Sequence, residues 1–554
     1  MEERRTGSAA AGKPKKSGGF LAQGSIYAAS GVISSLIGLV YRMPLTRIIG
    51  DEGNGYYAAA FNIYAIILLL SSYSLPLAVS KLISARVGAK NYRNAERILR
   101  ASLLYATVVG GIGCAAIFFG ADWLAGSLLR IPEAAYPLRA LAPTVWIVSY
   151  LGVCRGYWQG QSTMVPTALS QIIEQILNAV VSVGAAYFLM KWAVAKGKEE
   201  SMARAFGATG GTIGTGVGAA SALLLFVVIF LLSARHRARR ARLDARHREE
   251  SYEEITRLLV LTVVPVILST AIYNVSGILD NALFGQAMYD LGRQGEIAKQ
   301  YGVYTGKYKL LLNVPIMIAN SLGSALVPAL SRAVGARRGE EVKRNITLAI
   351  RFSMVVAIPA AVGLGVMADP LIPLLFGKSE LAVHIMQLGC LSVVLYSLST
   401  VSNAILQGTN HMQVPVMHAA LSLGIHVLTL EVLLRIFELG IVGVVIADMV
   451  FALSMCILNA ASLHSLLHYR QEIRRSFFLP AFCAALMGLV TAGAKIFLKR
   501  FTGRVVLYTL VPIFLAVAVY GALLLLTGAI RENELLRFPK GESLCRLARK
   551  LHLI

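Results

Sequence analysis

The sequence contains few charged residues, and acidic residues are the scarcer kind. Asp, Glu, Lys and Arg make up 15% of the 554 residues, with 29 acidic side chains against 53 basic ones. Hydrophobic residues make up 56% of the chain, and the mean hydropathy is +0.65. A soluble chain of this length would divide into several domains with far more surface charge. The composition therefore excludes an ordinary soluble protein.

Motifs of the common enzyme classes are also missing. The sequence has no H-E-x-x-H, no G-x-S-x-G and no G-x-x-x-x-G-K-[ST]. A membrane-embedded glycosyl- or acyltransferase would need a cluster of catalytic carboxylates or histidines at one membrane face, and the sequence indicates none. We therefore expect no catalytic residue, no enzymatic activity and no transport powered by ATP hydrolysis within this chain.

Cysteine and histidine are sparse and poorly spaced for metal binding. The six cysteines include no C-x-x-C pair, and five of them lie in or beside apolar runs. Small buried apolar residues explain them better than a disulfide framework or a zinc site. His418 and His426 lie about two helical turns apart with no third ligand at metal spacing. We interpret both histidines as structural and expect no metal site.

Long apolar runs are what the sequence has in abundance. A hydrocarbon core about 30 Å thick is crossed by about 20 residues of helix. A β-barrel would instead show short alternating segments. The sequence therefore predicts an all-α polytopic membrane protein with 14 transmembrane helices, at residues 20–41, 56–79, 101–120, 138–158, 165–190, 209–232, 256–279, 308–330, 352–376, 384–407, 414–434, 440–462, 478–497 and 505–527.

Basic residues gather in alternate connectors between these runs. By the positive-inside rule these connectors are cytoplasmic, and both termini are inside. The same distribution explains the net charge of +24 without any nucleic-acid partner, and it favours contact with anionic membrane lipids. The first run is too long for a removable signal peptide, so we expect a retained first span. The basic connectors are the N-terminus, 81–100, 235–257, 332–351, 470–475 and the C-terminal tail.

Two short patterns each occur twice. SARVGAK at 84–90 is echoed by SRAVGAR at 331–337, and QGQSTMVP at 159–166 by QGTNHMQVP at 407–415. Six spans separate the copies, so both copies have the same orientation in the membrane. Parallel repeats of this kind relate two lobes by an axis along the membrane normal, with a substrate path between them. The predicted organisation is a disordered N-terminus 1–19, an N-lobe 20–232, a basic linker 233–255, a C-lobe 256–462, two further spans in 463–530 and a tail 531–554.

Two arginines follow the first predicted span. A helix from Phe20 to Ile49 would be about 45 Å long, so it must tilt or bend, and Pro44 is the expected kink. Such a bend would turn Arg42, and with it Arg47, toward an internal cavity and an anionic ligand. The alternative is that both arginines extend to the outer membrane interface.

Other charged residues lie within or beside predicted spans, where ionisable groups are candidates for function. Lys307 and Lys309 open the eighth span and are either interface anchors or cavity cations. Glu174 lies deep in the fifth span and Asp448 in the twelfth, and we expect them to act in ion coupling or as counter-ions. Arg155 is interpreted as an anchor at the cytoplasmic side.

Two further patterns have plain structural interpretations. Glu431 and Arg435 are one helical turn apart, which predicts an interfacial ion pair. The glycine-rich stretch 207–218 opens the sixth span. Close helix packing or a turn explains these glycines better than phosphate binding.

The motifs resemble the multidrug/oligosaccharidyl-lipid/polysaccharide exporter superfamily. YRMPLTRIIGDEGNGYYAAAFNIY at 41–64 and SLPLAVSKLISARVG at 74–88 look like the SpoVB/YtgP branch, which is related to the MurJ lipid II flippases. SLGSALVPALSR at 321–332 is similar to the MurJ motif in the eighth span. The resemblance covers nearly the whole chain, but its motifs are weak indicators of the cargo.

The resemblance implies V-shaped lobes that alternate between inward- and outward-open states. It also implies a cationic cavity for a pyrophosphate-sugar headgroup, and a groove for the polyprenyl tail formed with spans 13 and 14. Arg42 and Arg47 lie at or near positions where MurJ-like proteins carry arginine, and Lys309 approximates a cation near the start of span eight. The sequence departs from MurJ at 61–75, which has no charged residue.

These observations favour a flippase that moves an undecaprenyl-pyrophosphate-linked cell-wall precursor, lipid II, to the outer leaflet of the bacterial cell membrane. One alternative is a flippase for a teichoic, capsular or spore-cortex oligosaccharide lipid. Another is a cation-coupled multidrug exporter. We expect a monomer without cofactors, whose partners are its lipid-linked oligosaccharide and membrane lipids. Its return step could be biased by Na+, H+ or the membrane potential.

Overall fold

The computed structural model describes residues 18–244 and 249–529, and within these ranges the regular secondary structure is all helical, without strands. The first half contains α1 (Gly18–Leu68), α2 (Leu75–Gly88), α3 (Tyr92–Asp122), α4 (Ala135–Gly160), α5 (Val165–Ala195) and α6 (Glu200–Leu243). The second half contains α7 (Tyr252–Asp290), α8 (Ile297–Val303), α9 (Lys309–Gly335), α10 (Gly339–Phe376), α11 (Glu380–Gly389), α12 (Ser392–Gly408), α13 (Gln413–Arg435), α14 (Ile441–Leu467), α15 (Leu479–Thr502) and α16 (Val505–Leu526).

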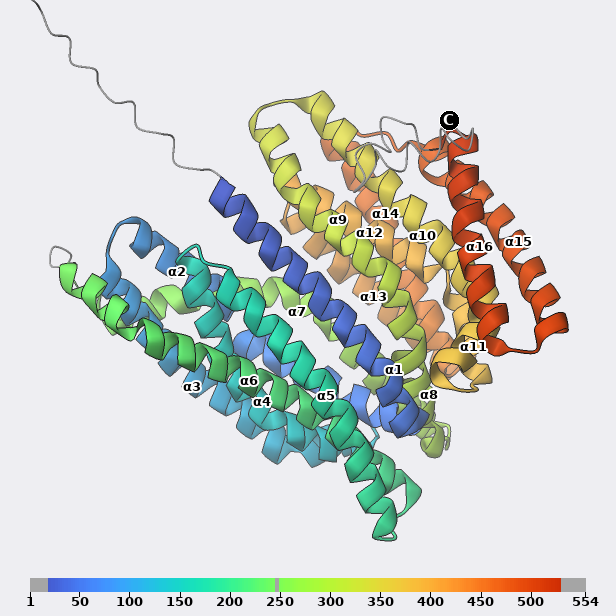
Figure 1. Ribbon diagram of the computed structural model, residues 1–554, viewed down its shortest axis with the longest axis horizontal. Coiled ribbons are helices and arrows are strands. Elements are labelled where there is room, and N and C mark those ends of the chain that lie inside the picture. The colour runs from blue at the N-terminus through green and yellow to red at the C-terminus, as the bar shows by residue number, and fades with distance from the viewer. Residues whose placement is uncertain (1–17, 245–248, 530–554) are drawn as a thin grey trace, which may run out of the picture.

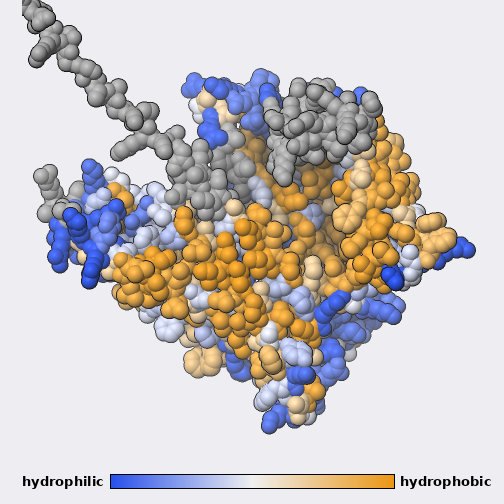
Figure 2. All heavy atoms as spheres, in the orientation of Figure 1, coloured by the Kyte–Doolittle hydropathy of each residue, from blue (hydrophilic) through white to orange (hydrophobic). Residues whose placement is uncertain are grey.

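Each predicted apolar run coincides with a helix or with two consecutive helices. Among the described residues, ten helices are long and apolar enough to cross a membrane, or eleven if the bent pair α11 and α12 is one span. Figure 2 shows hydrophobic side chains in a broad band across the molecule, with hydrophilic ones at the upper edge, far left and lower right. The fold class of an all-helical polytopic membrane protein is therefore confirmed, whereas the number fourteen stays a prediction.

The helices form two groups that meet along α1, α7 and α8. Helices α3, α4, α5 and α6 pack together with α1 in the first group, and α9, α10, α12, α13 and α14 form the second. Helix α7 contacts both α3 and α13, and α8 packs on α1. The last two helices, α15 and α16, pair with each other against α10 at the edge of the second group (Figure 1).

Helix α1 is a hairpin of two antiparallel segments, 18–49 and 51–68. Gly50 interrupts it with φ 71° and ψ −176°, a conformation open to glycine because it lacks a Cβ. The guanidinium carbon of Arg42 lies 5.0 Å from the ring centre of Tyr57, whereas a straight helix would separate the two residues by about 22 Å. Pro44 lies within the helical segment, where a bend stays a prediction, and the chain reverses at Gly50.

Glycines bring α6 into direct contact with α5. A Cβ at Gly210 would lie 2.4 Å from the backbone of Ala185 and Ala186, and one at Gly214 would lie 2.1 Å from the hydroxyl of Ser182. Ser182 donates a hydrogen bond of 2.7 Å to the carbonyl of Gly211 across the same contact. The interpretation of stretch 207–218 as a packing surface is confirmed.

The two halves approach most closely where α1 meets α8. A Cβ at Gly302 would lie 1.7 Å from the carbonyl oxygen of Asp51, and one at Gly55 would lie 1.9 Å from that of Ala298. Because no side chain fits between these backbones, the two halves are in direct backbone contact here. Asn62 also stabilises the contact of α1 with α8, because it donates a 2.8 Å hydrogen bond to the Tyr301 hydroxyl.

Candidate functional site

Two of the predicted site residues meet in the second half. Lys309 begins α9 and Asp448 lies on α14, and their Nζ and Oδ2 atoms are 3.4 Å apart. The carboxylate is nearly buried, with 7% of its side chain exposed, while Lys309 keeps 37% exposed. The ammonium also lies 4.6 Å from the ring centre of Tyr304 in η5 (Tyr304–Tyr308), a cation–π contact.

A second carboxylate and a histidine complete a cluster around Asp448. Asp280 of α7 and His426 of α13 are each 1% exposed, and Oδ1 of the aspartate lies 2.5 Å from Nε2 of the imidazole. One ligand atom each from Asp280, His426 and Asp448 lie within 4.8 Å of one another. The hydroxyls of Tyr304 and Tyr396 donate hydrogen bonds to Asp448. We call these three residues, Asp280, His426 and Asp448, the acidic cluster.

Charge balance determines what the acidic cluster can do. Two buried carboxylates are costly unless positive charge compensates them. Lys309 supplies one charge, and a proton within the acidic cluster or a bound cation would compensate the other. Carboxylate oxygens suit hard cations, whereas imidazole suits transition-metal ions.

Sequence reasoning found only part of this cluster. Asp280 lies just beyond the predicted run 256–279 and was assigned no role. His426 was interpreted as structural because its neighbours were sought along one helix, whereas its partner is on α7. A useful signal is the continuation of helical character through GILDNALFG, which places Asp280 inside a helix that extends to Asp290.

The predicted arginines of α1 lie apart from the acidic cluster and differ in their surroundings. Arg42 lies over the rings of Tyr57 and Phe61, at 5.0 and 5.9 Å. Arg47 is exposed and donates a hydrogen bond to the carbonyl of Leu374 on α10, which joins the two halves. Neither arginine is paired with a carboxylate in the part of the chain that the structure describes, so no ion pair there neutralises their charge.

Lys307 has a different environment from Lys309. Its side chain is 3% exposed, and its Nζ lies 2.6 Å from Oδ1 of Asp51, directly after the reversal in α1. The pair joins η5 to α1 beside the close contact at Gly302. Lys307 therefore holds the two halves together and is not available to a ligand in this conformation.

Glu174 has a counter-ion within its own half. Arg155 of α4 lies 2.6 Å from Oε2 of Glu174 on α5, and its Nε donates a 3.1 Å hydrogen bond to Ser170. Both side chains are mostly buried. Arg155 is thus part of an intramembrane pair in addition to any role as an anchor. The predicted pair of Glu431 and Arg435 is confirmed, at 2.6 Å.

An apolar groove of about 660 Å³ lies between α9, α10, α15 and α16. Its walls are almost entirely hydrocarbon, including Leu311, Ile318, Pro359, Leu364, Met487 and Val517. Helix α9 contributes to both sites, because Lys309 contacts Asp448 of the acidic cluster and Leu311, two residues later, lines the groove. An elongated hydrocarbon chain fits the chemistry of this groove.

Sequence comparisons identify relatives over the whole chain. Residues 20–334 match the family model of polysaccharide biosynthesis proteins, and residues 310–430 match the MatE model. The chain is 28% identical over 522 residues to stage V sporulation protein B of Bacillus subtilis (strain 168), covering 94% of this chain and 98% of that protein. It is 25% identical over 400 residues to the lipid II flippase MurJ of the same organism, covering 68% and 70%.

Solved structures share the fold. The inward-closed conformation of lipid II flippase MurJ aligns with a TM-score of 0.65 at 15% identity, covering 90% of this chain and 97% of that one. An inward-facing multidrug resistance MATE transporter of the MOP superfamily also aligns with a TM-score of 0.65, at 18% identity, covering 78% and 95%. The predicted resemblance to this superfamily is confirmed.

Proposed function

The chain belongs to the family of polysaccharide biosynthesis proteins, and from this membership we propose that it is an alternating-access flippase for a lipid-linked saccharide precursor. Its location would be the bacterial cell membrane, with both termini in the cytoplasm. In this proposal α1 to α6 and α7 to α14 are two parallel six-span repeats, and α15 and α16 are additional. Two relatives are named for lipid II flipping, which makes lipid II the first cargo to test.

The apolar groove is the observation that supports this function best. A polyprenyl tail is a long hydrocarbon, and it would lie in the groove while its pyrophosphate headgroup crosses between the halves. A multidrug exporter of compact molecules has no evident use for a groove at the outer edge of the second half. The groove therefore favours a lipid-linked substrate.

Cations provide the second requirement. A pyrophosphate carries at least two negative charges, and moving them out of water is costly unless positive groups compensate. Arg42, Arg47 and the partly exposed Lys309 would supply that compensation. For transport, this ligand must stabilise the occluded state and not one end state alone. The headgroup should therefore contact residues of both halves.

The first experiment combines genetic rescue with a blocked groove. The chain is expressed in bacteria depleted of their own lipid II flippase, and survivors are counted. Growth would support lipid II as cargo, and Gly363→Trp, which fills the groove, should abolish it. Gly424→Trp is the matched control, because a Cβ at either glycine meets nothing within 4 Å and Gly424 lies on α13 outside the groove. Absence of rescue despite good membrane expression would redirect the proposal to another oligosaccharide lipid. Equal growth of the two tryptophan variants would contradict the role of the groove.

The acidic cluster supports a proposal for energy coupling. A proton or Na+ bound among Asp280, His426 and Asp448 would bias the return of the empty carrier. In vesicles, flipping should respond to an imposed pH or Na+ gradient in the unmodified chain and lose that response in Asp448→Asn. A gradient response that survives in Asp448→Asn would place coupling elsewhere, with the pair of Glu174 and Arg155 as the next candidate.

The same cluster gives a cation-coupled multidrug exporter some support, since it is acidic and surrounded by tyrosines. That function predicts ion-driven efflux of a lipophilic cation from vesicles. Efflux of such a cation without any flipping of lipid II would favour the exporter. Flipping without efflux would favour the flippase.

A further inference from the structure

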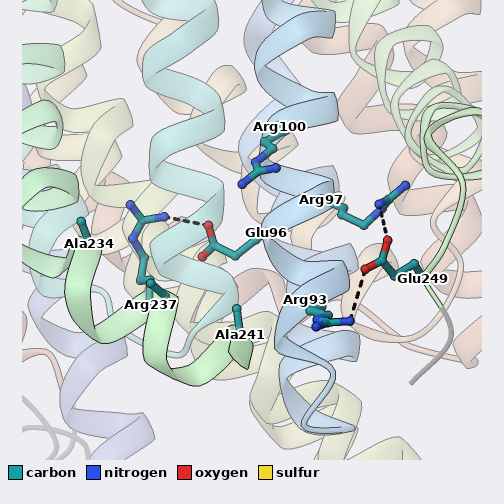
Figure 3. A pocket seen from close by; sticks show the side chains of 9 residues that line it. Arg93, Glu96, Arg97, Arg100, Ala234, Arg237, Ala241 and Glu249 are labelled. Carbon is teal, nitrogen blue, oxygen red and sulfur yellow. Dashed lines mark hydrogen bonds and ion pairs between the residues drawn. The ribbon is translucent and has the colours of Figure 1, made fainter. Parts of the chain in front are cut away.

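A basic pocket lies at the end of the first half that the charge distribution assigns to the cytoplasm. Its volume is about 410 Å³, and it is formed between α3, α6 and the segment before α7. Figure 3 shows Arg100 between Arg237 on one side and Arg97 on the other. The charged residues that line the pocket are Arg93, Glu96, Arg97, Arg100, Arg237 and Glu249.

The pocket has more positive charge than its own carboxylates can neutralise. Glu249 is shared by two arginines, with contacts of 3.3 Å to Arg93 and 2.8 Å to Arg97 (Figure 3). Glu96 is paired with Arg237 at 2.7 Å. Arg100 has no ion pair or hydrogen bond to any of the described residues. Four arginines thus face two glutamates, and the excess charge favours an anion with two or more oxygen acceptors.

Two of the arginines, Arg97 and Arg237, are held in place before any ligand arrives. The guanidinium of Arg237 lies 4.8 Å from the ring centre of Phe230, and that of Arg97 lies 4.5 Å from the ring centre of Tyr252. Arg97 also donates a 2.8 Å hydrogen bond to the carbonyl of Glu250. Because these side chains are already ordered, binding an anion costs less conformational entropy.

On the side of the pocket formed by α6, three of the lining side chains are short and non-polar. Helix α6 contributes Ala234, Ala238 and Ala241, whose methyl groups leave room for a headgroup against α3. Above the pocket, the face of α3 that carries Arg100 continues into Leu104 and Val108, which are 66% and 53% exposed. The anion site therefore opens directly onto a surface suited to acyl chains.

We propose that this pocket binds the phosphate of an anionic phospholipid from the cytoplasmic leaflet, with the acyl chains lying along α3. The phosphate is held by Arg97, Arg100 and Arg237, and the acyl chains pass over Leu104 and Val108. The site is separate from the acidic cluster and from the apolar groove. It holds a resident lipid whatever substrate the protein carries.

Calorimetric titration of the purified full-length chain in a neutral detergent tests this proposal. The three probes are dioctanoyl phosphatidylglycerol, dioctanoyl phosphatidylcholine and inorganic phosphate. Phosphatidylglycerol should bind most tightly, because it combines net negative charge with acyl chains. Arg100→Gln should weaken that binding about fivefold, as expected for the loss of one basic residue near a lipid surface. This variant leaves no carboxylate without its partner, because Arg100 forms no ion pair with the described residues. Arg239→Gln, an exposed charge on α6 outside the pocket, should change it less than twofold.

A second variant should change the affinity for phosphatidylglycerol in the opposite direction. Glu249 competes with the phosphate for Arg93 and Arg97, so Glu249→Gln should tighten the binding of phosphatidylglycerol. Absent binding of phosphatidylglycerol, equal binding of phosphatidylcholine, or equal weakening by Arg100→Gln and Arg239→Gln would overturn the proposal. Inorganic phosphate binding as tightly as phosphatidylglycerol would do the same, because it would indicate a site for soluble phosphates.

Discussion

Lys307, which is buried, and Asp51, which is partly exposed, form an ion pair across the two halves of the molecule, with 2.6 Å between Nζ and Oδ1. The pair lies beside the glycine contact of α1 and α8. It therefore fixes a conformation in which this end of the interface is closed.

The first prediction concerns the energy of that pair. Lys307→Met leaves Asp51, whose side chain is 20% exposed, without its partner, and this should destabilise the protein by less than the ~3–5 kcal/mol expected for a fully buried pair. The double variant Lys307→Met with Asp51→Leu removes both charges and should regain most of that loss. Thermal unfolding followed by fluorescence-detected size exclusion measures both. A double variant that is no more stable than Lys307→Met alone would contradict the pairing.

The second prediction concerns the cations available to a substrate. Arg42→Ala and Lys309→Ala should each reduce the rate of lipid II flipping in vesicles by tenfold or more, because a hydrogen bond to a charged group contributes about 1.5–3 kcal/mol. Lys378→Ala removes an exposed lysine after α10 and serves as the control. Full activity in both cavity variants would exclude an anionic headgroup at these residues.

The third prediction concerns the closed interface. Gly302→Val places methyl groups where the carbonyl of Asp51 lies, so α1 and α8 must separate. We expect transport to stop while the protein stays folded. A cysteine at position 62, in a chain without its native cysteines, should react faster with a membrane-impermeant thiol reagent. Gly335→Val is the control, since a Cβ there meets nothing within 4 Å. Unchanged labelling and transport would show that the contact between α1 and α8 does not control access to the interface of the two halves.

The fourth prediction concerns the packing of α5 and α6. Gly210→Leu should destabilise the protein by at least about 1–3 kcal/mol, because the new side chain overlaps the backbone of α5. Gly184→Leu adds the same side chain to α5 at a position with open space around it, and it should be tolerated. Melting temperatures of the two variants decide the matter. Equal melting temperatures would show that the packing of α5 against α6 does not require glycine at position 210.

The sequence predicted those parts of the fold that depend on local patterns. Apolar runs locate the helices, because membrane thickness sets their length. The repeated motifs also share their backbone conformation: Lys90 and Arg337 have φ of 59° and 54°, and Ser162 and Asn410 have φ of 60° and 68°. Equal turns at equal positions of the two motifs agree with an ancient duplication.

Features that join distant segments could not be predicted in the same way. Asp280 and His426 lie on helices that are far apart in the sequence, and no spacing within one chain indicates their contact. The reversal in α1 lies between the first two predicted spans, but the residue at which it occurs was not predicted. Proline at position 44 has a φ compatible with a helix, whereas a reversal needs the positive φ that Gly50 provides.

The hairpin in α1 has a consequence for how the protein enters the membrane during synthesis. Residues 18–49 and 51–68 are joined by a single residue, and the side-chain amide of Asn54 donates to the carbonyl of Gly50 at 2.8 Å. No water-exposed loop has to be translocated before the second segment leaves the ribosome. We therefore expect the two segments to insert together as one hairpin, in which the rings of Tyr57 and Phe61 lie beside Arg42.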